Sequence, residues 1–362
     1  MGAGTLFYSS LQVKNEAARE NPNLPAIQGL SEDTLKILYL ASLAPSGHNT
    51  QPWMITIKEP DWWGIGSDEA RWLPAVDPDN REMMLSVGAF VETMAAAAGT
   101  QGYNAEFDIV GKDNASPEIA EVKFSKRGGV GGSCREIKER RTIRKSLLKN
   151  PVKEEDLQYL VGNNKHEVFY YPRTSRAGTY LSQATLLANR TQAYREDAQR
   201  ELAEWIRWSE RDAREYRNGL TPESMEMQGI AQWYAKHFLS KQDVLSKTFR
   251  EETVKLVEEY VQHCAGWLVI KSDNSTVTHL IKSGRVFQST WLRACERAIA
   301  FHPMTQVLEE YPWRTQLAQE LNLTGDIQFV IRIGYSNEYP KPVSLRMPIN
   351  GLLAKKQDAI PM

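Results

Sequence analysis

The sequence predicts an α+β protein of two pseudo-symmetric halves, each with a mostly antiparallel sheet packed by helices. Two observations support this fold class. Segments with helically spaced apolar residues alternate with strand-like runs, and their order in residues 31–126 is repeated imperfectly in residues 134–348. The glycine-rich run 127–133 lacks a strand–turn–helix context, so we interpret it as a flexible connector. An N-terminal extension over 1–30 and a C-terminal tail over 349–362 complete the chain.

Helix and strand signals follow one another through the first half. Ser31 is a favourable N-cap residue, and Pro45 disfavours helical backbone in the residue before it. A turn at 77–80 is expected to begin the second helix. The expected elements are a helix from Ser31 to Ala44, strands over 53–58 and 70–75, a helix ending near Gly102, and a hairpin of 106–110 with 118–126.

The second half repeats this scheme with one large insertion. Its expected elements are a helix start at 152–157, a strand at 168–171 like that at 53–58, a helical run at 284–287 like 88–90, and a closing strand at 327–335 like 106–110. The insertion covers about residues 201–250. Within it, 201–215 is expected to be a mostly solvated helix. The methionines and aromatic residues of 220–238 suggest a loop that is either a lid over a binding site or a surface excursion packed on the core.

Composition excludes several classes of function. With 44 basic and 45 acidic residues, the net charge of −1 predicts no nucleic-acid or membrane-surface role. No apolar run is expected to reach the roughly 18–20 residues that span a bilayer. Three scattered cysteines suit a reducing compartment. Residues 1–8 are apolar but follow no basic segment, so we expect a cytoplasmic protein, with export through a signal trimmed before residue 1 as the alternative.

The most distinctive stretch is the loop from Pro45 to Trp53. Prolines restrain both of its ends and Gly47 permits a turn, while the Asn49 and Gln51 amides offer donors and acceptors together. Such groups suit the polar edge of a flat heteroaromatic ring. The same residue types also form ordinary turns at the ends of helices, and composition alone does not separate the two interpretations.

A second polar cluster is the basic run from Arg140 to Lys145. Guanidinium groups bind phosphate oxygens two at a time, but a run of mixed charges can equally be a solvated helix end. The six histidines show no metal-ligand spacing, and no nucleophile–base set or general acid can be named. The sequence therefore predicts no metal site and no catalytic side chain.

Three motifs resemble the FMN-dependent nitroreductase family. Residues 45–53 match six positions of its P-S-x-x-N-x-Q-P-W loop, 140–145 resemble its R-R-S-x-R/K segment, and 332–348 resemble its closing strand and basic tail. The resemblance implies the arrangement of a symmetric dimer, in which one subunit provides the loop motif of a flavin site and the other subunit provides its arginine motif. Here each half carries one of the two motifs. The chain thus resembles the single-chain, pseudo-dimeric Acg-like branch, which implies a nitroreductase-like fold and one FMN at the junction of the halves.

The resemblance assigns residues to the cofactor. The phosphate of FMN would be bound by arginines and a threonine, and its ring and ribityl chain by residues of the loop 45–53. Gln51 would stabilise the shape of that loop. A backbone donor near flavin N5 would come from the loop after the long C-terminal helix. The implied phosphate residues are Arg140, Arg141, Thr142, Arg144 and Arg346, the ring residues are Pro45, Ser46, Gly47 and Asn49, and the N5 loop is Met304 and Thr305. Ser344 stands where the family often has lysine, a charge that Lys341 could supply.

The implied function is an oxidoreductase in which NAD(P)H reduces FMN and the flavin reduces a nitroaromatic, a quinone or a related small acceptor. An alternative is an FMN-binding protein that sequesters the flavin under a closed lid with little turnover. A third is a scaffold that has lost its flavin. Since the dimer-like interface is internal, the resemblance is compatible with a monomer.

Overall fold

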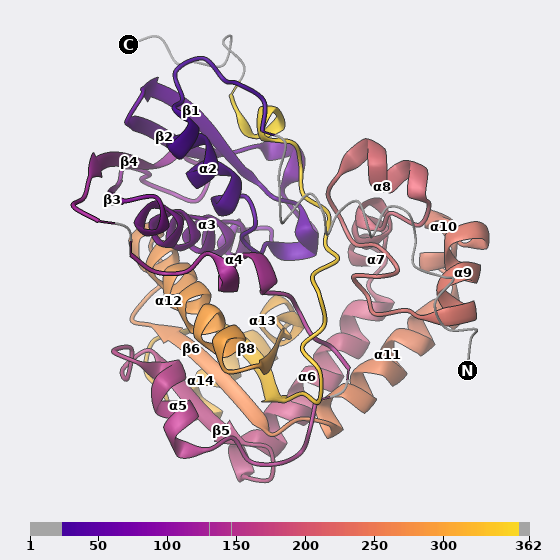
Figure 1. Ribbon diagram of the computed structural model, residues 1–362. Helices are drawn as coiled ribbons and strands as arrows, with labels where there is room; N and C mark the ends of the chain where they lie inside the picture. The colour runs from indigo at the N-terminus through magenta and orange to yellow at the C-terminus, as the bar shows by residue number, and fades with distance from the viewer. Residues whose placement is uncertain (1–23, 130, 146, 355–362) are drawn as a thin grey trace, which may run out of the picture.

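Two four-stranded antiparallel sheets form the framework of the computed structural model, which describes residues 24–129, 131–145 and 147–354 (Figure 1). The first sheet has the order β1 (Trp53–Glu59), β2 (Trp62–Ser67), β4 (Glu118–Lys126), β3 (Tyr103–Ile109). The second has the order β5 (Val168–Pro172), β6 (Gly266–Ser272), β8 (Asp326–Tyr335), β7 (Ile299–Pro303). The strands of both sheets are thus ordered first, second, fourth and third along the chain. This repetition confirms the predicted α+β fold in two related halves.

Equivalent helices occupy equivalent places in the two halves. One helix precedes each first strand, and a longer one connects the second and third strands. The pairs are α2 (Glu32–Ala41) with α5 (Glu154–Val161), and α3 (Arg81–Thr100) with α12 (Val277–Glu296). Ser31 caps α2 as expected, since its side chain accepts from the Thr34 backbone N–H at 3.1 Å and closes a capping box.

The two long helices join the halves at a reciprocal glycine contact. A Cβ added to Gly88 of α3 would lie 2.3 Å from the Ile281 carbonyl oxygen, and one added to Gly284 of α12 would lie 2.2 Å from the Leu85 carbonyl oxygen. Each helix therefore presents the same kind of position to the other, as expected at a pseudo-twofold axis. One hydrophobic core continues from the first half into the second around this contact.

Some strand expectations were wrong. Residues 70–75 form no strand: η2 (Glu69–Arg71) is a 3-10 helix, and the strand beside β1 is β2. Two glycines hide β2 in the sequence, and Gly66 is needed because a Cβ there would lie 2.2 Å from the Pro117 carbonyl oxygen. By strand order, β8 corresponds to β4 rather than to residues 106–110. The strands β6 and β7 were not predicted.

A helical insertion separates β5 from β6, where the first half has only a tight turn between β1 and β2. It contains α6 (Arg176–Tyr194), α7 (Glu196–Trp205), α8 (Glu210–Tyr216), α9 (Gly229–Phe238), α10 (Lys241–Val244) and α11 (Lys247–Gln262). The helices α6 and α11 contribute to a core with strands of the second sheet, while α7, α9 and α10 contribute to a smaller cluster. Residues 229–238 are helical, which corrects the expectation of a loop throughout 220–238.

The C-terminal segment returns from the second half to the first (Figure 1, yellow). The Ala354 backbone N–H donates to the Ile55 carbonyl at 2.9 Å, beside a bridge between Leu353 and Ile55. Shorter elements are η1 (Gly47–Asn49), α4 (Arg135–Glu139), α13 (Gln306–Glu309), α14 (Trp313–Glu320) and η3 (Ile349–Leu352). This return path carries residues 341–347 along the junction of the halves.

The helix α3 is, among the described residues, long and apolar enough to cross a membrane, contrary to the expectation from the sequence. In the structure 72% of its apolar window is buried. A core helix that packs on all sides has the same composition, and α3 packs against α12, α2 and β3.

Candidate functional site

The loop of residues 45–53 has an unusual backbone held by its own polar groups. His48, Asn49 and Gln51 have φ values of 46°, 56° and 56°, a region that disfavours residues with a side chain. The Ser46 hydroxyl accepts from the Gln51 backbone N–H at 2.9 Å. The prolines and Gly47 alone do not explain this shape, so contacts with the rest of the chain must maintain it.

Those contacts come from the insertion and from the C-terminal segment. The Asn49 amide donates to the carbonyls of Gly219 at 3.0 Å and Leu345 at 3.2 Å. The fully buried Gln51 donates to the Arg217 carbonyl at 3.2 Å and accepts from the Met347 backbone N–H at 2.9 Å. Both amides are therefore engaged with backbone groups, and the insertion covers the loop.

Two of the predicted phosphate arginines lie at this loop. Arg140 donates to the Leu43 carbonyl at 2.8 Å and stacks over the Trp291 ring at 4.4 Å. Arg346 donates to the same carbonyl at 2.9 Å and to the Asn49 side-chain oxygen at 3.0 Å. Carbonyls at the end of a helix lack intrahelical partners and attract cations, which explains the convergence just beyond α2. Burial lowers the pKa of Arg140 to about 10, so it remains charged at neutral pH.

The other two predicted arginines surround a carboxylate of the insertion. Glu226 accepts from the Arg141 guanidinium at 3.1 Å, from the Arg144 backbone N–H at 3.1 Å and from the Lys145 backbone N–H at 2.8 Å. The Arg144 side chain donates to the Ser224 carbonyl at 2.6 Å. The structure therefore separates Arg141 and Arg144 from Arg140 and Arg346, which were expected to act together.

A buried basic cluster behind Arg144 was missed by the sequence analysis. Arg332 of β8 is fully buried and donates to the carbonyls of Arg144 and Tyr260. His302 lies beside it on β7, and burial together with the charges of Arg332 and Arg144 lowers the pKa of His302 well below its usual value. The imidazole is therefore neutral at neutral pH. An arginine inside the otherwise apolar run 329–333 of β8 was the signal that could have identified this cluster.

The remaining predicted residues are placed as follows. The Met304 backbone N–H donates to the Val330 carbonyl at 2.8 Å, so this donor is committed to the fold. The Thr305 hydroxyl donates to Glu309 at 2.7 Å. The Thr142 carbonyl accepts from Arg141 at 3.2 Å. Pro45 and Gly47 are half-buried at the start of the loop.

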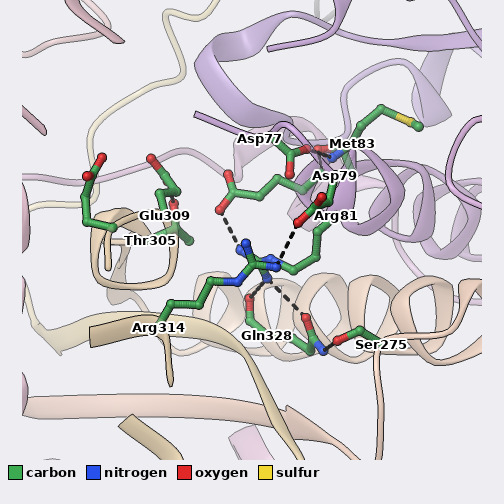
Figure 2. Close-up of polar contacts among 12 residues, drawn as sticks. Asp77, Asp79, Arg81, Met83, Ser275, Thr305, Glu309, Arg314 and Gln328 are labelled. Carbon is green, nitrogen blue, oxygen red and sulfur yellow. Dashed lines mark hydrogen bonds and ion pairs between the residues drawn. The ribbon is translucent and has the colours of Figure 1, made fainter. Parts of the chain in front are cut away.

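Two carboxyl groups meet close to Gly47 and were also missed. A Cβ added to Gly47 would lie 3.9 Å from a Glu82 carboxyl oxygen. Glu82 shares a hydrogen bond with Glu309 and is paired with Arg81 at 2.9 Å. Figure 2 shows Arg81 directed to Gln328, with Thr305 and Glu309 close to one another. Burial, and next the charge of Glu309, raise the pKa of Glu82 well above its ordinary value, so this carboxyl is protonated when an exposed one is not.

Curated relatives resemble the chain along most of its length, although no family model matches it. It is 24% identical over 324 residues to the probable NAD(P)H nitroreductase PigM of Serratia sp. (strain ATCC 39006), covering 85% of this chain and 89% of the relative. It is 24% identical over 331 residues to the putative NAD(P)H nitroreductase acg of Mycobacterium tuberculosis, covering 89% and 95%. The chain is therefore similar to proteins named as NAD(P)H nitroreductases over most of its length.

Solved structures of nitroreductases resemble the chain more weakly. The FMN-dependent nitroreductase NfnB from Mycobacterium smegmatis, in complex with NADPH, is 15% identical with a TM-score of 0.36, covering 63% of this chain and 96% of that one. A nitroreductase-like protein from Bacillus cereus is 13% identical with a TM-score of 0.34, covering 62% and 96%.

Proposed function

We propose that this chain is an FMN-dependent oxidoreductase that takes reducing equivalents from NAD(P)H and passes them to a nitroaromatic, a quinone or a related small acceptor. One observation carries the proposal: Arg140 of the second half and Arg346 of the C-terminal segment both donate to the Leu43 carbonyl, just before the polar loop of the first half. Arg140 reaches the end of α2 at the Leu43 carbonyl, and Arg346 contacts Asn49 within the loop. The names of the relatives PigM and acg support the same activity.

The donors around Glu226 fit an FMN phosphate. Two consecutive backbone N–H groups, those of Arg144 and Lys145, point to one anion together with the Arg141 guanidinium. Such a set of donors binds a phosphate as well as a carboxylate. The buried Arg332 adds positive charge behind it. We therefore assign the phosphate to Arg141, Arg144 and Lys145 rather than to Arg140.

The chain's own residues would bind, orient and shield the cofactor, while hydride chemistry comes from the flavin when it is bound. Ser46, Gly47 and Asn49 are assigned to the ring side of the junction. Burial raises the pKa of the Glu82 carboxyl beside Gly47, which reduces negative charge next to the ring side of the site.

A second function, flavin sequestration with little turnover, is favoured by the packing of the insertion. Its backbone contacts Asn49 and Gln51, and its Glu226 contacts the arginine segment, so it covers both parts of the proposed site. A cover of this kind restricts access of NAD(P)H and acceptor. Loss of flavin binding is the third outcome to be tested.

Visible spectra of the protein incubated with FMN separate these functions. Under anaerobic conditions, a flavin band that bleaches with NAD(P)H and returns with a nitroaromatic or quinone supports the oxidoreductase. A band that persists with NAD(P)H but bleaches with dithionite supports sequestration. Absence of any bound flavin band contradicts both.

A further inference from the structure

The Glu226 carboxylate occupies an anion site made by a different part of the chain. One carboxylate oxygen accepts from the Arg141 guanidinium and the Arg144 backbone N–H, both at 3.1 Å, and the other accepts from the Lys145 backbone N–H at 2.8 Å. The Glu226 side chain is only 9% exposed. A largely buried carboxylate with three donors on two oxygens is bound as a ligand would be.

A closed turn presents this carboxylate. Thr221 and Ser224 bond reciprocally, each backbone N–H donating to the other's hydroxyl, at 2.8 and 3.2 Å. The Met227 backbone N–H closes the turn on the Pro222 carbonyl at 2.9 Å. Glu226 has a φ of 60°, which disfavours a residue with a side chain. The turn therefore keeps its shape through its own bonds, while the strained Glu226 is retained by the anion site.

The charges around the site exceed what one carboxylate neutralises. Arg141 and Arg332 are buried and Arg144 is half-buried, and Arg332 donates to the carbonyls of Arg144 and Tyr260 rather than to an acid. A phosphate dianion neutralises more of this charge than Glu226 does and can accept more hydrogen bonds. An incoming phosphate monoester can therefore compete with the side chain.

We infer that Glu226 is an internal competitor for the flavin phosphate: it occupies the phosphate site when no flavin is bound and leaves it when FMN enters. The inference rests on the proposed function. The turn is then linked to occupancy of the site, because the Lys145 side chain also contacts the Glu226 carbonyl at 3.1 Å. Helix α9 is joined to the turn through Lys236 and Gln232, which both contact Glu223. Binding of FMN requires this part of the insertion to move.

The test compares ligands with and without a phosphate. Glu226→Gln retains the shape of the side chain but removes its charge, so FMN affinity is expected to rise about tenfold while riboflavin affinity stays unchanged. Glu223→Gln is the matched control, since Glu223 lies in the same turn but pairs with Lys236 and Gln232. It should leave the FMN-to-riboflavin affinity ratio at the wild-type value. Inorganic phosphate is the third probe and should bind more tightly to Glu226→Gln than to wild type.

Several results would overturn the inference. An equal rise for FMN and riboflavin would mean that the substitution only loosens the cover, and a lower FMN affinity would mean that Glu226 helps to form the site. If neither protein binds flavin but Glu226→Gln gains phosphate binding, Glu226 competes with phosphate at this site while the proposed flavin function fails. Hydrogen exchange of the wild-type protein gives a second readout: saturating phosphate should speed exchange in residues 221–227 and protect the amides of Arg144 and Lys145. Unchanged exchange in both would contradict the competition.

Discussion

Replacing Gly284 by alanine is expected to destabilise the protein, because at this glycine the backbone of α12 lies close against the backbone of α3. The added Cβ would lie 2.2 Å from the Leu85 carbonyl oxygen and 2.8 Å from the Gly88 Cα. Both are backbone atoms of α3, so no flexible side chain can move aside. The helices α3 and α12 must separate by about 1 Å or the core around them must deform, which costs about 1–3 kcal/mol for an overpacked core.

Urea unfolding of matched variants measures this effect. Gly88→Ala makes the reciprocal change and should cost a similar amount. Gly99→Ala is the control in the same helix: its Cβ would lie 3.5 Å from the Gly131 carbonyl oxygen, an ordinary contact. There alanine should be neutral or stabilise by up to about 1 kcal/mol through helix propensity. Equal stability of the Gly284→Ala and Gly99→Ala variants would refute the reasoning about the helix contact.

The other predictions concern the charged groups. Arg141→Ala should weaken FMN binding by about 1.5–3 kcal/mol for the charged hydrogen bond lost and leave riboflavin binding unchanged. Equal losses for both ligands in titrations would contradict the phosphate assignment. Glu82→Gln should flatten the dependence of stability on pH. The pKa of Glu82 is raised in the folded protein, so wild-type stability falls as pH rises above the pKa of glutamate in the unfolded chain, about 4.3. The expected decrease in the free energy of unfolding is up to about 1.4 kcal/mol per pH unit. Identical urea midpoints of the two proteins from about pH 4 to 8 would exclude this effect.

Local patterns predicted much of the fold. Ser31 was expected as an N-cap from its residue type and the acidic turn after it, and the hairpin of β3 and β4 from its alternation. The strands β2 and β6 could not be found in this way. Glycines depress the strand signal of β2, and β6 is buried on both faces and therefore does not alternate. Alternating hydrophobicity identifies a strand that has one exposed face and one buried face. It cannot identify a strand whose two faces are both buried.

The site was less predictable because its contacts join distant parts of the chain. Arg140 to Arg144 were identified as a basic cluster, yet only the structure shows that Arg140 turns to the end of α2 while Arg141 and Arg144 contact Glu226. Glu226 itself lies in a turn without a motif. The pairing of Glu82 with Glu309 likewise depends on the packing of α3 near α13 and has no signature in the sequence.

Titration of the protein with FMN, followed by flavin absorbance and by the mass of the complex in solution, tests the central claim most directly. A single site formed at the internal junction predicts saturation at one FMN per chain, with the protein a monomer before and after. Saturation at one FMN per two chains, accompanied by dimer formation, would show that a second copy completes the site. No saturable binding would contradict the flavin site altogether.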